Sequence, residues 1–173
     1  MKVRIDDIPP EGLFLDLKED GNRLFANETF SRFDEKIISH LELRPVGQSI
    51  TLSGGLQARL LLQCSRCLVE FKFPLDSDFN LEYRSVSEIS EGGEVQLTAD
   101  EMDVQYYKEG AIDLDEVIMG QISEGIPFKP LCKESCRGLC LKCGENLNQR
   151  SCGCVTETVD PRLAKLKDLL ENK

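Results

Sequence analysis

The amino-acid sequence predicts an α+β fold, made mainly of an antiparallel β-sheet or a partly closed barrel, with one or two packing helices and a cysteine-rich module near the C-terminus. Three observations lead to this expectation. Between residues 37 and 83, apolar and polar side chains alternate with a period of two, as in half-buried strands. Residues 113–125 instead repeat apolar side chains at helical spacing. Six of the eight cysteines fall between residues 131 and 155.

The N-terminal part contains two short extended candidates, residues 3–5 and 13–17, which Pro9 and Pro10 separate. Leucine occupies every second position of the latter candidate, which predicts a strand with one buried face. Residues 18–22 are polar and include a glycine, so a turn is expected there.

A β-rich region begins at residue 37. Its first alternating run ends at Pro45 and Gly47, residue types that interrupt strands. A second run starts at Ile50 and reaches the sequence Ser53-Gly54-Gly55, which is typical of a turn. We therefore expect a turn at residues 53–55.

Two longer alternating runs, residues 56–63 and 69–75, flank Cys64 and Cys67. This arrangement predicts a β-hairpin with the CxxC motif at its tip, where a tight turn presents two thiolates side by side. A polar turn is expected at residues 76–78, after which the alternation resumes.

The remaining elements are a loop, a strand and two helices. Residues 85–103 are acidic and contain glycine, as expected of a solvated loop, and residues 104–107 predict a further strand. Asp113 is a favourable N-cap for a helix that ends near Pro127. A C-terminal helix is expected at residues 160–170, where leucines form one apolar stripe.

Composition excludes several function classes. The 173 residues are 40% apolar, enough for one domain of ordinary size. The net charge of −10 disfavours contact between the body of the protein and nucleic acid, and the single histidine, His40, excludes catalysis that needs several imidazoles. The N-terminus does not resemble a secretory signal, and no apolar run approaches the roughly 18 residues of a membrane span. We therefore expect a cytoplasmic protein without membrane contact.

In a reducing cytosol, closely spaced cysteines indicate metal ligands rather than disulfides. The simplest interpretation is two tetrahedral zinc sites, one of which staples the cysteine-rich segment onto the hairpin tip. The ligands of the local site would be Cys140, Cys143, Cys152 and Cys154. The ligands of the stapling site would be Cys64, Cys67, Cys132 and Cys136. Two other arrangements remain open: Cys64 and Cys67 with Cys140 and Cys143, or a single zinc held by Cys136, Cys140, Cys143 and Cys152.

The zinc, one ion or two, is expected to be structural. Residues 131–155 contain few aliphatic side chains, too few to offset backbone ordering of about 1–2 kcal/mol per residue. Zinc bound by four thiolates supplies on the order of 10 kcal/mol of folding free energy. An all-thiolate site also leaves no position for a catalytic water. A redox role for Cys64 and Cys67 is disfavoured, because a strand pattern rather than a helix follows the motif.

We expect two parts packed as one compact unit: a β-rich α+β platform with the CxxC hairpin at residues 1–128, and a zinc module with the C-terminal helix at residues 129–173. From residue 129 to 154 the chain is locally basic, with a net charge of +3 that leaves −13 elsewhere. The candidate contacts to RNA phosphate are Lys129, Lys133, Arg137, Lys142 and Arg150. Because each zinc–thiolate site carries −2, a solvated zinc staple without RNA contact is an equal alternative.

Five short segments carry a specific combination of motifs: residues 52–56 (LSGGL), 64–68 (CSRCL), 112–114 (IDL), 138–148 (GLCLKCGENLN) and 160–166 (DPRLAKL). This combination resembles the YceD-like family, whose members are called large ribosomal RNA subunit accumulation proteins, in a variant rich in cysteine. The likeness extends from about residue 41 to residue 170.

The resemblance implies a non-enzymatic bacterial or organellar protein that supports accumulation of large-subunit (23S-type) ribosomal RNA. The expected partner is the pre-ribosomal large subunit, ribosomal RNA or a basic ribosomal protein, and no small-molecule substrate is expected. Some family members keep only the hairpin CxxC and others lack it, so the cysteine-rich segment is not the family's common functional centre. The alternatives are a zinc-ribbon nucleic-acid-binding or transcription-related module, and a CxxC thiol–disulfide protein.

Overall fold

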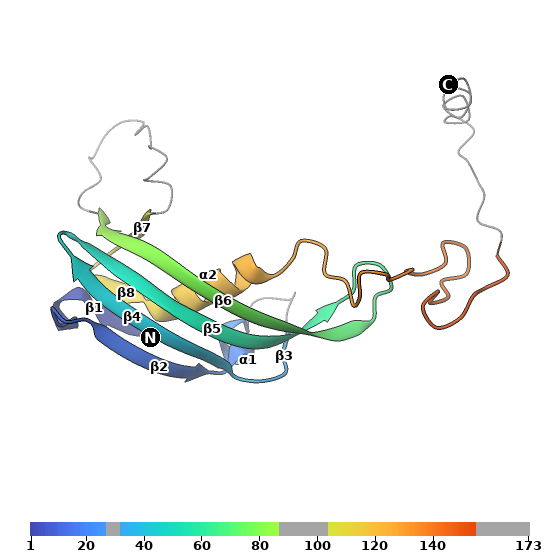
Figure 1. Cartoon of the computed structure of the whole chain (residues 1–173), viewed down its shortest axis with the longest axis horizontal. Coiled ribbons are helices and arrows are strands. Elements are labelled where there is room, and N and C mark those ends of the chain that lie inside the picture. Colours follow the sequence, from blue (N-terminus) through green and yellow to red (C-terminus); the bar gives the residue numbers. More distant parts are fainter. Residues whose placement is uncertain (27–31, 87–103, 155–173) are drawn as a thin grey trace, which may run out of the picture.

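The structure, a computed structural model, describes residues 1–26, 32–86 and 104–154. A strongly curved β-sheet forms the body, one long helix lies in the hollow of the curve, and the cysteine-rich segment lies at one end of the sheet (Figure 1). Within the described ranges, no helix is long and apolar enough to cross a membrane. The expected C-terminal helix and nearly all of the expected acidic loop lie outside these ranges.

The main sheet has the strand order β2-β4-β5-β6-β7, and β3 pairs with β5 beside this path. Its strands are β2 (Leu13–Glu19), β3 (Arg32–Phe33), β4 (Ile37–Val46), β5 (Ser49–Gln63), β6 (Glu70–Ser85) and β7 (Val104–Tyr107). All pairs are antiparallel except β6 with β7, which is parallel. The prediction of a mainly antiparallel, partly closed sheet is confirmed.

A second, two-stranded sheet pairs β1 (Lys2–Arg4) with β8 (Ala111–Asp113). A short 3-10 helix, η1 (Ile5–Asp7), follows β1. The long helix α2 (Leu114–Gly125) follows β8, and its N-cap is Asp113, whose side chain accepts a hydrogen bond from the Asp115 backbone N–H at 3.1 Å. The predicted cap and the predicted end of this helix are confirmed.

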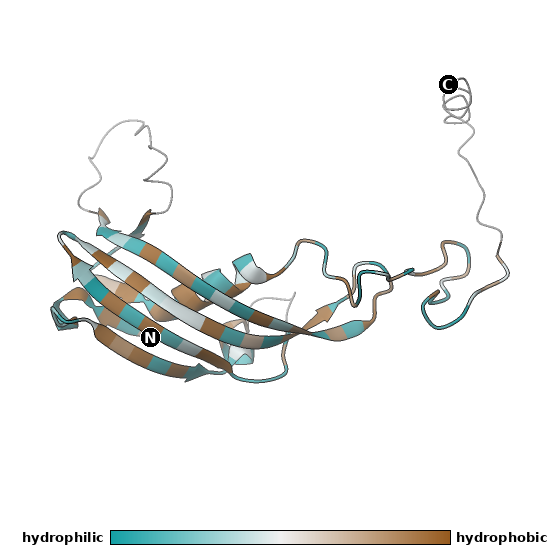
Figure 2. Cartoon of the chain, in the orientation of Figure 1, coloured by the Kyte–Doolittle hydropathy of each residue, from teal (hydrophilic) through white to brown (hydrophobic). Residues whose placement is uncertain are grey.

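The core lies between the inner face of the sheet and α2. Alternate residues of β4 and β5 are buried, and the bands of hydropathy along these strands show the same alternation (Figure 2). Ile118 and Ile122 of α2 are fully buried in one cluster with Leu56 and Leu60 of β5. Burying each such side chain stabilises the fold by about 1.5–3 kcal/mol. This packing holds in place the sheet whose two longest strands end at the hairpin tip.

The turns expected at residues 53–55 and 76–78 do not form, because β5 and β6 run straight through them and pair with each other there. A Cβ atom on Gly54 would collide with the His40 carbonyl oxygen and lie 2.9 Å from the Leu41 side chain. A Cβ atom on Gly55 would lie 2.8 Å from the Asp78 carboxylate. The two glycines therefore permit close approach of neighbouring strands, the other common role of glycine inside a strand.

The turn expected at residues 18–22 is replaced by a short helix, α1 (Gly21–Leu24). The Asp20 side chain caps it by accepting a hydrogen bond from the Asn22 backbone N–H at 3.0 Å. The Asn22 side chain also accepts from the Phe33 N–H at 3.0 Å and donates to the Phe33 carbonyl at 3.1 Å. These bonds to a residue 11 positions away hold the segment helical, which a local turn pattern does not reveal.

The hairpin of β5 and β6 is the longest paired unit, with a register that runs from Ile50 opposite Tyr83 to Gln63 opposite Glu70. Near its tip, beyond β4, β5 also pairs with the two-residue strand β3. The hairpin therefore carries the CxxC tip to the end of the sheet, where the cysteine-rich segment returns to meet it (Figure 1).

Candidate metal centres

Residues 64–69 close the tip of the hairpin. The Cys64 backbone N–H donates to the Val69 carbonyl at 2.9 Å, and the Leu68 N–H donates to the Cys64 carbonyl at 3.0 Å. Leu68 adopts a positive φ of 58°, which lets the loop turn back tightly. The fold turns Cys64 and Cys67 inward, so that they are only 0% and 4% exposed. The CxxC motif forms the predicted knuckle.

The chain after α2 docks on this knuckle through backbone contacts. The Ser65 N–H donates to the Pro130 carbonyl at 2.8 Å, and the Arg66 guanidinium donates to the Cys136 carbonyl at 2.9 Å. Gly138 has a positive φ of 74°, and a Cβ atom there would lie 3.1 Å from the Arg66 carbonyl oxygen. Two distant segments of the chain thus interlock at the hairpin tip.

This docking gathers four thiols into what we call the hairpin centre: Cys64, Cys67, Cys132 and Cys136. Their sulfur atoms all lie within 4.8 Å of one another. The Sγ atoms of Cys64 and Cys136 are 3.7 Å apart, and those of Cys67 and Cys132 are 3.6 Å apart. Each close contact joins the knuckle to the returning chain.

The other four thiols form the distal centre: Cys140, Cys143, Cys152 and Cys154. Their sulfur atoms also lie within 4.8 Å of one another. The Gly144 N–H donates to the Cys140 carbonyl at 2.9 Å, and the Cys140 N–H donates to the Glu145 carbonyl at 2.8 Å. Gly144 has the positive φ of 73° that this tight knuckle requires. The structure thus groups the eight thiols as the two-site arrangement expects and in neither of the other two arrangements.

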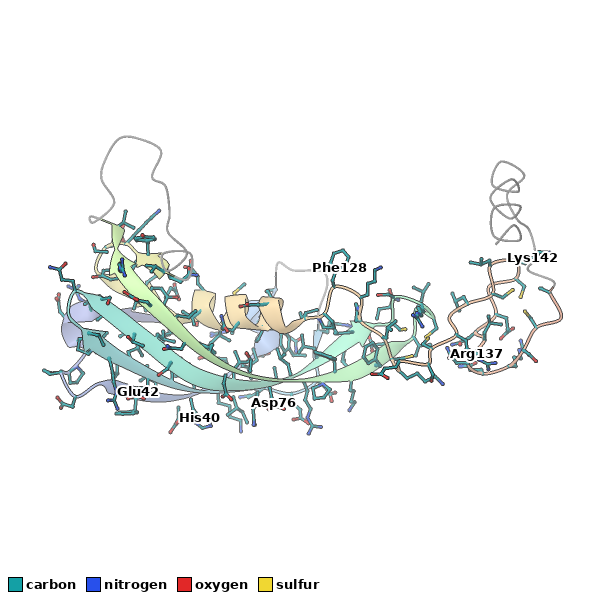
Figure 3. All side chains as sticks on the ribbon, turned by 45° about the horizontal axis from the view of Figure 1, so that its top comes forward. His40, Glu42, Asp76, Phe128, Arg137 and Lys142 are labelled. Carbon is teal, nitrogen blue, oxygen red and sulfur yellow. The ribbon has the colours of Figure 1, made fainter. Side chains whose placement is uncertain are left out.

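The spacing and donor set of both centres fit a tetrahedral thiolate-bound metal. All eight cysteines are free thiols, and the sulfur pairs at 3.6 and 3.7 Å are too far apart for disulfide bonds. A tetrahedron with metal–sulfur bonds of about 2.3 Å has edges of about 3.8 Å, close to these separations. The only histidine, His40, lies on the sheet well away from the cysteine-rich segment (Figure 3). Both centres could therefore hold a metal with thiolate ligands alone.

The thiols of each centre differ in acidity. Burial raises the pKa of Cys64, but three backbone N–H groups, led by that of Cys132, stabilise its thiolate and bring the pKa down to about 6. Burial and the neighbouring thiols raise the pKa of Cys132 to about 12. In the distal centre, backbone N–H groups of Cys143 and Lys142 lower the pKa of Cys140 to about 6. Each centre therefore contains a thiolate ready to bind a cation, which displaces protons from the others.

The redox alternative gains no support from the geometry. A thioredoxin-type CxxC opens a helix, whose N-terminus stabilises the reactive thiolate. Here Cys67 is followed by a short loop and strand β6. Cys64 is also fully buried, which limits access to a second thiol or disulfide.

The five candidate phosphate contacts are exposed, but they are not equivalent: Lys129, Lys133, Arg137, Lys142 and Arg150. Arg137 and Lys142 lie on the distal part of the cysteine-rich segment (Figure 3). Arg150 forms an ion pair with Glu145 at 2.5 Å, and this contact lowers the pKa of the Glu145 carboxyl. Arg150 is therefore the least available of the five to a phosphate.

Three further residues were not expected from the sequence. Phe128 and Leu141 are 98% and 96% exposed, although apolar residues in a short run normally indicate burial. Asn148 donates a hydrogen bond to the Cys136 sulfur at 3.3 Å. A local sequence pattern predicts neither the exposure of Phe128 and Leu141 nor the hydrogen bond of Asn148, because each depends on how the chain returns to the hairpin tip.

Comparison with known proteins places these observations in a family. Residues 52–170 match the sequence model described as large ribosomal RNA subunit accumulation protein YceD, a span that includes all eight cysteines. No solved structure matched the chain.

The curated relatives include uncharacterized mycobacterial proteins. One from Mycobacterium tuberculosis is 30% identical over 143 residues, which is 79% of this chain and 64% of the relative. One from Mycobacterium leprae is 28% identical over 134 residues, which is 75% of this chain and 57% of the relative. The match to these relatives therefore spans less than two thirds of their length.

A plant relative carries the family's name. The chloroplastic large ribosomal RNA subunit accumulation protein YCED homolog 1 of Arabidopsis thaliana is 38% identical over 60 residues, which is 35% of this chain and 19% of the relative. The family model itself covers well over half of the chain, from β5 through both groups of cysteines. On that match, the chain belongs to the YceD family.

Proposed function

We propose that this protein is a non-enzymatic ribosome-biogenesis factor that supports accumulation of large-subunit ribosomal RNA. The observation that carries the proposal is the family match over residues 52–170, which includes the hairpin, α2 and both cysteine centres. The protein would act by binding a pre-ribosomal large subunit, its RNA or a basic ribosomal protein.

We also propose that both centres hold Zn²⁺ in a structural role. Four thiolates saturate a tetrahedral ion and leave no position for a catalytic water. The cysteine-rich segment needs such support, because its main apolar contacts are the cysteines themselves with Phe71, Leu131 and Leu139. Leu141 contributes nothing to this cluster, since it is 96% exposed. The apparent binding free energy of a structural zinc, about 10–16 kcal/mol, would supply what the apolar contacts do not.

The proposed partner surface has two parts of different charge. The segment from residue 129 to 154 carries the five candidate phosphate contacts, and the rest of the chain carries a net −13. The exposed face of the sheet bears acidic side chains that include Glu42 and Asp76 (Figure 3). A basic ribosomal protein would be attracted to the acidic part of the chain outside residues 129–154, and RNA phosphate to the cysteine-rich end.

The test is the ratio of large- to small-subunit ribosomal RNA in cells depleted of the protein. We expect the ratio to fall and the large-subunit peak to shrink on a sucrose gradient. The wild-type gene should restore both, and expression of an unrelated zinc protein serves as the control. An unchanged ratio in fully depleted, growing cells would contradict the proposed function.

A further inference from the structure

Asn148 lies in the sequence between cysteines of the distal centre, but its side chain contacts the hairpin centre. It lies in the loop between Cys143 and Cys152, both of the distal centre. Its Nδ2 group nevertheless lies 3.3 Å from the Sγ atom of Cys136, in the hairpin centre. Its Oδ1 atom accepts a hydrogen bond from the Arg137 backbone N–H at 2.9 Å. Asn148 thus bridges the two groups of thiols.

The orientation of the Asn148 amide follows from its partners. A backbone N–H can only donate, so the amide oxygen must face Arg137. The NH₂ group then faces the Cys136 sulfur, and its second hydrogen reaches the Asn146 Oδ1 atom at 2.9 Å. All three contacts are consistent with one another, and together they engage the whole side chain.

The loop that carries Asn148 is anchored at both ends in the distal centre. The loop of residues 144–151 contains one sizeable apolar side chain, Leu147, which is only half-buried. The Leu147 N–H donates to the Gly138 carbonyl at 2.9 Å, and the Asn148 N–H donates to the Asn146 side chain at 3.0 Å. Cys143 and Cys152 stand at the ends of this loop, so a metal bound in the distal centre closes it.

From this arrangement we infer that Asn148 couples the two centres, so that metal binding in one raises the affinity of the other. A closed distal centre holds the Asn148 N–H against Cys136, and this hydrogen bond stabilises the thiolate that binds metal in the hairpin centre. The coupling is reciprocal by thermodynamic linkage. The inference rests on the proposed zinc occupancy. Its consequence is that the one-zinc form is less populated during zinc uptake than it would be with independent centres.

The test is a double-mutant cycle on the purified full chain. One variant, Cys152→Ser with Cys154→Ser, opens the distal centre. The second, Asn148→Asp, keeps the acceptor for the Arg137 N–H and loses the donor to Cys136. Zinc affinity of the hairpin centre is measured by competition with a chelating dye. We expect each variant to lose about tenfold to a hundredfold in affinity, the usual cost of an outer-shell contact, and the combination to lose no more than either alone.

Gln149→Glu is the matched control, because it makes the same amide-to-carboxylate change one position along, at an exposed residue. It should leave the affinity unchanged, whereas Asn148→Ala, which adds no charge, should behave like Asn148→Asp. Cobalt substitution gives a second readout, since removal of the N–H···S bond should shift the sulfur-to-cobalt charge-transfer band of the hairpin centre. Unchanged hairpin-centre affinity in the opened variant, or losses that simply add, would overturn the coupling.

Native mass spectrometry separates this inference from the proposed occupancy. A two-zinc protein whose one-zinc form is as abundant during titration as that of the Asn148→Ala variant would contradict the coupling and leave the occupancy intact. A protein that takes up no zinc would contradict the occupancy itself.

Discussion

At the scale of single residues, glycine is the residue type whose role local sequence leaves most open. Ser53-Gly54-Gly55 has the composition of a turn, yet these residues lie in the middle of β5 and pair on both sides. The reason is the pairing of β5 with β4 and β6, which brings the His40 carbonyl and the Asp78 side chain against the two glycines. Only the pairing of three strands reveals this crowding, so a local pattern cannot distinguish it from a turn.

Gly54→Ala should destabilise the sheet, because the new methyl group would collide with the His40 backbone, which cannot move without breaking strand pairing. We expect a loss of about 1–3 kcal/mol, the usual cost of overpacking, measured by urea denaturation. Gly120→Ala in α2 is the control, since a Cβ atom there has nothing within 4 Å and should stabilise the helix by about 0.5–1 kcal/mol. Equal stability of the two variants would show that Gly54 is not crowded.

Phe128 offers a direct test of RNA contact, because the chain contains no tryptophan. Phe128→Trp places a single indole at a position 98% exposed, between Pro127 and Lys129. If unpaired RNA binds at this end, a base should stack on the ring and quench its fluorescence. Phe14→Trp, on the exposed face of β2, is the control and should not respond. Equal responses at both positions, or none at either, would argue against RNA contact at Phe128.

At the scale of elements, the hairpin and α2 could be predicted because local pattern and tertiary packing agree there. Alternation along β5 and β6, interrupted by Cys64 and Cys67, predicts the knuckle, and the Asp113 cap predicts the start of α2. The spacing of the cysteines makes the two groups of thiols the simplest of three arrangements that it leaves open. Spacing does not predict how the returning chain docks, since that depends on hydrogen bonds from the Ser65 N–H and the Arg66 guanidinium to carbonyls of the returning chain.

Acidification should release zinc from the two knuckles, because protons compete with the metal for thiolates. The lowest thiol pKa values, those of Cys64 and Cys140, are about 6 without metal. Without metal, these two thiols are therefore ionised above this pH and become protonated as the pH falls through it. Bound zinc shifts their protonation to lower pH. We expect dye-detected zinc to rise progressively below about pH 6. Circular dichroism of the sheet serves as the control for acid unfolding, and full zinc retention at pH 3 would contradict the expectation.

At the scale of the whole molecule, the body and the cysteine-rich segment depend on different forces. The two large apolar clusters of the body contain no cysteine, and the third cluster is made mostly of cysteines. The body should therefore fold by apolar burial, whereas the segment should fold only with its metal. Sequence composition already suggests this division, because aliphatic side chains are scarce between residues 131 and 155.

Removal of zinc by a strong chelator should unfold the cysteine-rich segment and spare the sheet. We expect protease cleavage to begin between residues 129 and 154, while the β-sheet signal in circular dichroism remains. Magnesium-loaded chelator is the control, since it cannot extract zinc. Loss of the sheet signal together with the segment would show that the body also depends on the metal.

The long pairing of β5 with β6 has a further consequence for how the molecule approaches a partner. With −2 at each centre, as the proposed zinc occupancy gives, residues 129–154 and the two centres together carry a net charge near −1, against −6 for the described residues of the body, 1–26, 32–86 and 104–128. The protein is therefore an electric dipole as well as an anion. Near a polyanionic particle, the field repels the body more than the hairpin end and turns the molecule tip-first before contact. Encounters with the particle are then biased toward the tip-first orientation. Added salt should remove this bias at lower concentrations than those that weaken direct contacts.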